Sequence, residues 1–423
     1  MYLLTHNLFI NKRNSFTALV FLFASIQASA QNVSSPYSII GIGDIESSYF
    51  NRTSGMANTG IAYRNNTYII LNNPAAISEL QSQLFIVELS SRGKFVTYSG
   101  NGLATNLTGK DFSVERLSLG IRVNKWWGSS IGLMPFSTSN YAFSGTKSLE
   151  GTSSTLPVQY DGSGGVNRYF FANGFRITKN LSVGVNTSFL GGSLTQQDSL
   201  ISPDLSTALY TTRNIYIRNL YLEYGLQYHI PVTKKWDINL GATYAQKTAL
   251  RAQTTALVKD NTNDTLSNKV LTNNFFTLPN STGLGIAVIK DKKLTFLADY
   301  RFQDWSSLNI RGNNYSLVNS SRYSVGVEYS KQKDYMRISY ETFNLQAGAF
   351  YNKSYLKINN EQINDAGFTL GAGLNSRRSS MSYNLSFEYG VRGSQSLIKE
   401  SYAGFTIGIS YKDFWNTKGK KYF

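Results

Sequence analysis

The residue types that most often carry enzyme chemistry are scarce in this chain of 423 residues. It contains no cysteine, which excludes disulfide scaffolds, thiolate metal sites and cysteine nucleophiles. Of its two histidines, His6 lies in a segment that we expect to be removed, and one imidazole is too few for a histidine-ligated zinc site. His229 has no matching serine nucleophile motif. The sequence therefore predicts neither an enzyme nor a bound cofactor or metal.

Charged residues at alternate positions are the other candidates for chemistry. Arg116, Asp299, Arg301, Glu328 and Arg337 alternate with apolar residues, a spacing that places them on the polar face of β-strands. One interpretation is a network of ion pairs that holds the interior together. The other is a ligand site, because an arginine beside apolar side chains suits a ligand carboxylate, and Arg116 and Arg337 are the candidates for it.

Residues 1–30 have the pattern of a secretory signal peptide. Lys12 and Arg13 form a basic region, residues 16–24 are apolar, and residues 28–30 read Ala-Ser-Ala, a typical cleavage site. A membrane anchor is the alternative, but it needs about twenty apolar residues, and this run is roughly half as long. We therefore expect the mature chain to begin at Gln31.

Apolar and polar residues alternate along a long series of segments from about residue 84 onward. In residues 116–123, leucine, isoleucine and valine share one face, while arginine, serine and glycine share the other. A period of two is the signature of a β-strand with two different faces. The wall of an outer-membrane β-barrel requires this pattern, because one face meets lipid and the other meets a polar lumen.

About fourteen such strands can be counted, and the connections between them alternate between short and long. We therefore predict an all-β fold for residues 84–423, a transmembrane antiparallel β-barrel with both termini and a short C-terminal tail in the periplasm. A soluble β-sandwich is the alternative, but nothing in that fold explains the alternation. The predicted strands lie near 84–98, 114–124, 128–144, 164–176, 181–197, 208–230, 235–253, 273–290, 292–307, 322–331, 334–345, 364–376, 379–393 and 401–412.

The net charge of the chain is +16, and much of the excess lies in the short connections and in the tail at residues 418–421. One or two basic residues per hairpin, without a recognition helix or a stacking groove, indicate a solvated rim, so we predict no nucleic-acid partner. Aromatic residues at the same strand ends are consistent with an interfacial girdle; they are Trp126, Trp127, Trp236, Phe414 and Trp415.

Residues 31–83 do not alternate in this way and are rich in glycine, serine and asparagine. They form either a disordered leader or a plug folded into the lumen. The plug, or hatch, is favoured because residues such as Ile61, Ile69, Ile70 and Ile77 give the segment enough apolar side chains to pack.

Several motifs in order resemble the FadL-type outer-membrane transporters of long-chain fatty acids and other hydrophobic compounds. A glycine-rich segment ends in Asn73, Pro74 and Ala75 just before the barrel, as the hatch of that family does. Residues 277–287, 297–300, 337–340 and 371–374, with Trp305 and Tyr329, continue the similarity over the mature chain. Residues 36–38 and 41–44 resemble the divergent members of Bacteroidota. PorV-like proteins belong to the same superfamily.

The resemblance implies that a ligand enters an apolar pocket, the hatch shifts, and the ligand leaves sideways through a gap at a kinked third strand. Pro135 lies in the third predicted strand, where a proline removes a ladder donor and marks a break or bulge. We interpret Pro135 as the marker of a lateral gate. The alternative is a bulge without a role in transport.

The leading functional prediction is an outer-membrane channel of a Gram-negative bacterium for passive uptake of hydrophobic small molecules such as long-chain fatty acids. The runner-up is a protein-binding barrel of PorV-like type that serves secretion or an outer-membrane complex. The expected partners are outer-membrane lipids, a hydrophobic ligand, and an outer-membrane or periplasmic protein. An outer-membrane hydrolase is the least supported alternative, because no Ser-His pair is evident.

Overall fold

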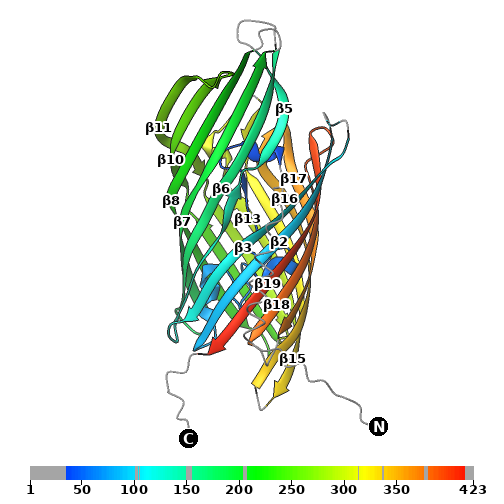
Figure 1. Ribbon diagram of the computed structural model, residues 1–423. Helices are drawn as coiled ribbons and strands as arrows, with labels where there is room; N and C mark the ends of the chain where they lie inside the picture. Colours follow the sequence, from blue (N-terminus) through cyan, green and yellow to red (C-terminus); the bar gives the residue numbers. More distant parts are fainter. Residues whose placement is uncertain are drawn as a thin grey trace, which may run out of the picture.

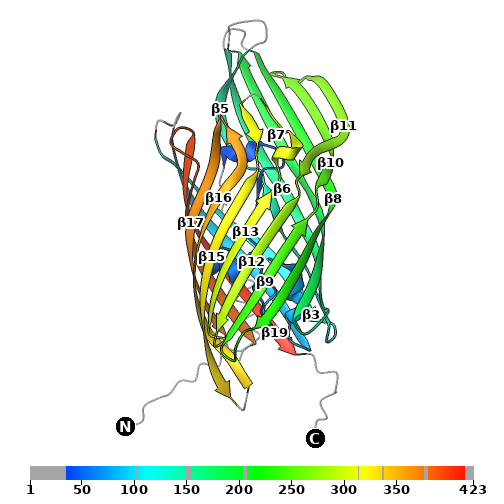
Figure 2. The same ribbon diagram turned by 180° about the vertical axis from the view of Figure 1, so that it is seen from behind.

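The computed structural model describes residues 35–100, 103, 105–148, 155–202, 207–312, 314–335, 338–375 and 380–414. Within them the chain is almost entirely β-structure, arranged as a tall barrel with a short segment of chain inside it (Figures 1 and 2). Among these residues, no helix has the length and apolar character needed to cross a membrane.

The wall is built from long antiparallel strands. They are β2 (Leu84–Gly100), β3 (Leu107–Arg122), β4 (Trp127–Thr138), β5 (Tyr141–Ser148), β6 (Thr155–Arg176), β7 (Leu181–Ser202), β8 (Thr207–Pro231), β9 (Trp236–Ala245), β10 (Thr248–Asp260), β11 (Thr265–Leu278), β12 (Ser281–Lys290), β13 (Leu294–Gln303), β15 (Ser320–Tyr335), β16 (Ile338–Ile358), β17 (Glu361–Asn375), β18 (Met381–Arg392) and β19 (Ile398–Phe414).

These strands form a closed barrel of fourteen wall positions in the described part of the chain. Three positions are occupied by two pieces in sequence: β4 with β5, β9 with β10, and β11 with β12. The last strand pairs with the first along its whole length, from Ile398 opposite Gly100 to Phe414 opposite Leu84. The predicted antiparallel barrel is therefore confirmed. On the wall seen from behind, β9, β12, β13 and β15 lie side by side (Figure 2).

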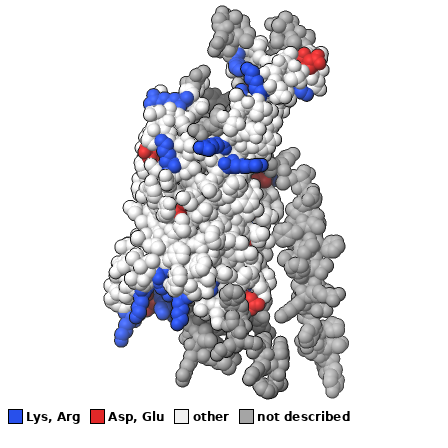
Figure 3. Space-filling model, turned by 90° about the vertical axis from the view of Figure 1, so that its left-hand side faces the viewer, with Lys and Arg blue, Asp and Glu red and all other residues white. Residues whose placement is uncertain are grey.

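The two faces of the wall differ as the alternation requires. Leu117 is 48% exposed on the outside, whereas its neighbours Arg116 and Ser118 are buried on the inside. In the face shown in Figure 3, lysine and arginine gather toward the two ends and leave a largely uncharged band between them. Such a band is what a hydrocarbon layer requires of a barrel surface.

Residues 35–83, which we call the luminal segment, lie inside the barrel (Figure 1). The segment has little regular structure, and its backbone groups bond both to one another and to side chains of the wall. It contains the 3-10 helices η1 (Pro36–Ile39), η2 (Arg52–Met56) and η3 (Pro74–Glu79) and the two-residue strand β1 (Asp44–Ile45). A further short helix, η4 (Ser306–Leu308), and β14 (Tyr315–Leu317) lie in the connection from β13 to β15.

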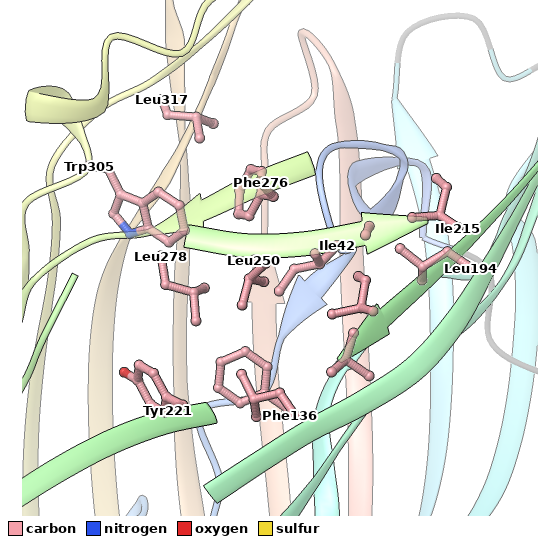
Figure 4. Close-up of a cluster of buried hydrophobic side chains, with 14 of the residues drawn as sticks. Ile42, Phe136, Leu194, Ile215, Tyr221, Leu250, Phe276, Leu278, Trp305 and Leu317 are labelled. Atoms are coloured by element: carbon pink, nitrogen blue, oxygen red, sulfur yellow. The ribbon is translucent and has the colours of Figure 1, made fainter. Parts of the chain in front are cut away.

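A cluster of buried apolar side chains lies between the luminal segment and the strands β4, β7, β8, β10 and β11 (Figure 4). We call it the apolar cluster. Ile42 of the luminal segment lies within it, so the segment and the wall share one core. Its labelled members are Ile42, Phe136, Leu194, Ile215, Tyr221, Leu250, Phe276, Leu278, Trp305 and Leu317.

Candidate functional site

The wall is split between β3 and β4. These two strands pair only from Leu117 opposite Leu133 to Arg122 opposite Gly128. Above this point β3 continues through residues 107–116, where β2 is its one partner among the described residues. In Figure 1 the upper part of β3 diverges from β5, which follows β4 in the sequence.

Pro135 lies where β4 leaves its regular course. The pairing of β4 with β6 shifts register between Pro135 and Ser137. Beyond the proline, Ser137 and Thr138 pair with Ile45 and Asp44 of β1. The upper part of β4 therefore bonds to the luminal segment along the edge that faces β3 lower down.

Residues 35–38 of the luminal segment bridge the lumen directly behind this split. On one side, the Ser35 amide donates to the carbonyl of Asn140 at 2.8 Å, in the junction between β4 and β5. On the other side, the Ser35 hydroxyl donates to Glu400 at 2.6 Å and the Tyr37 hydroxyl donates to the Ile398 carbonyl at 2.5 Å. Both acceptors are on β19. Burial raises the pKa of Tyr37 to about 12, so this phenol remains a donor at neutral pH.

Two ion pairs hold the next residues of the same segment. Arg392 of β18 donates twice to Asp44, with both contacts at 2.7 Å. Arg92 of β2 contacts Glu46 and Glu115, both at 3.1 Å. Bidentate arginine–carboxylate contacts fix orientation as well as distance, so β1 is attached to the wall at both ends.

Deeper in the lumen, a single arginine of the luminal segment is enclosed by two carboxylates of the wall. Arg52 Nε donates to Glu328 at 2.9 Å, and its two terminal nitrogens donate to Glu341 at 2.7 Å each. The Arg52 side chain is fully buried. Glu328 also accepts from the Tyr63 hydroxyl at 2.9 Å and from Gln346 at 2.7 Å. The luminal segment is therefore anchored by a buried charge network.

The Asn73, Pro74 and Ala75 motif begins η3 and touches the wall. The Asn73 side chain accepts from the Ala75 amide at 3.0 Å and donates to the carbonyls of Ile61, Leu226 and Ala242 at 2.9–3.2 Å. The wall opposite the motif is glycine, because a Cβ at Gly225 would lie 2.0 Å from Asn73 Oδ1 and one at Gly184 would lie 2.3 Å from Pro74. These glycines permit close approach of the two backbones.

Four of the five charged residues singled out in the sequence contact the luminal segment. Asp299 accepts from the amides of Gly60 and Ile61 at 2.7 and 3.0 Å. Arg116 pairs with Glu88 at 3.1 Å and donates to the Ile69 carbonyl, while Arg301 contacts the Tyr49 hydroxyl at 3.4 Å. Glu328 binds Arg52 as described, and Arg337 lies outside the described residues.

The residues that the sequence analysis missed are mainly the partners of these charges. Arg52, Glu46 and Asp44 lie in a segment without regular alternation, so nothing local distinguishes them from solvated charges. Arg392 lies at the end of β18, where the alternation assigns it to the inner face, but its partner lies 348 positions away in the sequence. The glycines opposite η3 did carry a signal, since Gly184 and Gly225 both occupy positions on the inner face of strands.

A cavity of about 160 Å³ lies on the side of β1 away from β4. Its lining is mostly polar and charged, and Ile45 and Tyr355 connect it to the apolar cluster. The apolar cluster itself is filled by side chains of the chain, with Ile42 and Trp305 fully buried. The charged and amide residues of the cavity are Asp44, Glu46, Arg301, Gln303, Arg322, Asn352, Asp365 and Arg392.

Within the described residues, no group of three or more histidine, aspartate or glutamate side chains is placed to hold a metal ion. The structure thus combines a wall that is split between β3 and β4, a luminal segment that lies behind the split, and buried ion pairs that hold this segment.

Comparison with protein families gives one match, in which the BamG family model covers residues 12–422. Comparison with curated proteins gave no match.

Solved structures with the same fold include three hydrophobic-compound channels or their relatives. A Pseudomonas aeruginosa FadL homologue is 14% identical with a TM-score of 0.60, over 88% of this chain and 100% of that one. The Ralstonia pickettii toluene transporter TbuX is 18% identical with a TM-score of 0.58, over 89% and 99%. The CymD monoaromatic hydrocarbon channel is 17% identical with a TM-score of 0.57, over 90% and 99%. At these identities the likeness is one of fold.

Proposed function

Because the chain belongs to the BamG family and has the fold of these hydrophobic-compound channels, we propose that it is a channel of the Gram-negative outer membrane. It takes up apolar small molecules, long-chain fatty acids among them, and releases them sideways into the membrane. Its resting state is closed by the luminal segment, which acts as the hatch.

The observation that carries this proposal is the split between β3 and β4. A closed barrel normally pairs every strand on both edges, because unpaired backbone groups are costly in a hydrocarbon layer. Here β4 pairs with β3 over six residues and then with the luminal segment. A molecule held in the upper lumen therefore has a path to the lipid that crosses no complete strand.

The part of the luminal segment behind the split is the element that must move. Residues 35–46 are held by the β1–β4 pairing and by the Asp44–Arg392 and Glu46–Arg92 pairs. Displacement of β1 would join the cavity beside Arg301 to the split in the wall. Pro135 favours this arrangement, because the third wall strand cannot continue a regular ladder through it.

A reversible tether tests the proposal. Ile45 and Ser137 are opposite each other in the β1–β4 pair, and the chain contains no cysteine. Replacing both by cysteine should allow a disulfide, since opposed residues lie within disulfide reach. We expect oxidation to reduce uptake of a radiolabelled long-chain fatty acid at least tenfold, and reduction to restore it.

The matched control places the same disulfide between two wall strands, with Leu385→Cys on β18 and Ile407→Cys on β19, which are also opposite each other. This tether should leave uptake unchanged. Equal uptake by the oxidised and reduced forms of the Ile45→Cys/Ser137→Cys protein would refute the movement of β1.

A protein-binding barrel of PorV-like type is the second candidate function. The apolar cluster favours it, because the upper lumen is packed with the chain's own side chains instead of presenting an open apolar pocket. Mild extraction of the barrel from native outer membranes followed by mass spectrometry separates the two. A stoichiometric apolar ligand supports the channel, and a stoichiometric protein partner with no such ligand supports the binding barrel.

A further inference from the structure

Within the described part of the chain, the upper part of β3 is an unpaired strand edge. Over residues 107–116 it pairs with β2 on one side and with no described residue on the other. In an antiparallel strand every second residue directs both its N–H and its C=O to the same edge, so about five donors and five acceptors face the split. An edge of this kind is a template for another strand.

Part of this edge lies at the level of the membrane. Val114 and Phe112 point outward and are 54% and 41% exposed, in line with the lipid-facing residues lower on β3. Lys110 is the first charged residue above them on the outer face. Backbone groups beside Val114 and Phe112 therefore face a layer that offers no water to satisfy them.

The described chain does not supply a strand for this edge. β1 is paired with β4, and β5 is paired with β6. A second copy of the protein does not fit either. A twofold axis along the membrane normal makes two β3 strands, each tilted by roughly 40°, cross at about 80° instead of lying side by side.

We propose that the free edge of β3 is the docking site for an extended strand of a partner protein. The strand adds antiparallel to β3, and because β3 runs from the outer surface toward the periplasm, the docked strand runs from the periplasmic side outward. The proposal uses the split on which the proposed function rests, and it adds a partner that narrows the exit when bound.

The side chains of β3 define the chemistry of the docked strand. Phe112 and Val114 call for apolar residues on its lipid face. Asp111 lies on the lumen side opposite Lys94 of β2, and the described residues give it no ion pair within 4 Å, so a lysine or arginine of the docked strand would be its partner on the free edge. Glu115 at the lower end is already paired with Arg92. When a strand adds to a sheet edge, its backbone hydrogen bonds supply the affinity, and its alternate side chains supply the specificity.

The test uses single cysteines and defined peptides. The mature chain carrying Ser113→Cys, on the lumen face of the free edge, is placed in lipid nanodiscs. Ten-residue probe peptides alternate valine with lysine or serine, and one cysteine is moved along the lumen-facing positions. The control is Ser386→Cys on β18, which also faces the lumen but is paired on both sides by Gly371 and Thr406.

We expect disulfide formation with Ser113→Cys to peak at one cysteine position of the peptide and to exceed the control at least tenfold. N-methylation of the peptide amides that face β3 should lower the yield at least tenfold. Equal yields at Ser113→Cys and Ser386→Cys, or yields insensitive to N-methylation, would overturn the docking site.

Uptake is measured with the same variants in sealed proteoliposomes without peptide, so that the two proposals fail separately. Register-specific docking without any uptake of an apolar compound would refute the proposed channel but not the docking site. Uptake without register-specific docking would refute the docking site but not the channel.

Discussion

Replacing Arg52 by methionine should loosen the luminal segment far more than any surface charge deletion would. Arg52 makes three charge-assisted contacts of 2.7–2.9 Å with Glu328 and Glu341 in a fully buried position. Its removal leaves two wall carboxylates without their cation, and breaking a buried pair in this way costs about 3–5 kcal/mol.

The expected effect is local, because the wall strands keep their ladders. The amides of Ala57 and Gly60 donate to Thr369 and Asp299 of the wall, at 2.7 Å each, and report on the attachment of the segment. Hydrogen exchange of these amides should accelerate by about two to four orders of magnitude, since each tenfold corresponds to about 1.4 kcal/mol.

Arg213→Met is the matched control, because Arg213 is 45% exposed and lies 3.5 Å from Asp198. A surface pair of this kind contributes about 0–1 kcal/mol. Equal exchange rates at Ala57 and Gly60 in the two variants would show that the Arg52 network does not hold the segment, and the reasoning would be wrong.

Three further outcomes follow from the same contacts. Gly225→Ala places a Cβ 2.0 Å from Asn73 Oδ1 and should destabilise the attachment of η3 by about 1–3 kcal/mol, seen as faster exchange at Ala75, whereas Gly404→Ala, with its nearest atom at 3.9 Å, should not. Although burial by itself raises the pKa of Glu79, Arg64 and Arg176 together lower it below its ordinary value. The stability that Glu79 contributes is therefore present above its ordinary pKa and is lost as pH falls through the lowered value. The protection factors of the η3 amides should therefore fall in acid in the wild type but much less in Glu79→Gln. Pro135→Val should restore a ladder donor to β4 and slow uptake of apolar substrates several-fold in a cell-based assay, and unchanged uptake would favour a bulge without a role in transport.

The barrel was predictable because its signal is local and repeated. Each strand carries its own alternation, so Leu117 and Ser118 indicate their faces without knowledge of the rest of the chain. The strand count is preserved even where a wall position is broken into two pieces, as at Gln246 between β9 and β10, because both pieces keep the same direction. The prediction of fourteen strands is confirmed for this reason.

The contacts of the luminal segment could not be predicted in the same way. Arg52 meets Glu341 across 289 positions of sequence, and neither residue carries a local sign of the other. The alternation with apolar residues does place Asp299, Arg301 and Glu328 on the inner face. It does not decide between a structural network and a ligand site, because that depends on which groups fill the lumen. The roles assigned to Asn73, Pro74, Ala75 and Pro135 stay predictions until the transport experiments are made.

The distribution of contacts favours a sideways route over a straight one. A ligand that passed down the lumen would have to displace Arg52 from two carboxylates and the Gly60 and Ile61 amides from Asp299, and then free Asn73 from three wall carbonyls. The first of these steps alone costs about 3–5 kcal/mol. A sideways route requires movement of β1, which is held by two paired residues and by the Asp44–Arg392 and Glu46–Arg92 contacts. Since Asp44 and Arg392 also line the polar cavity, water or a polar ligand group can solvate them as they separate, which lowers the cost of this step. The element that lies behind the split is thus also the part of the luminal segment whose ion pairs border the polar cavity.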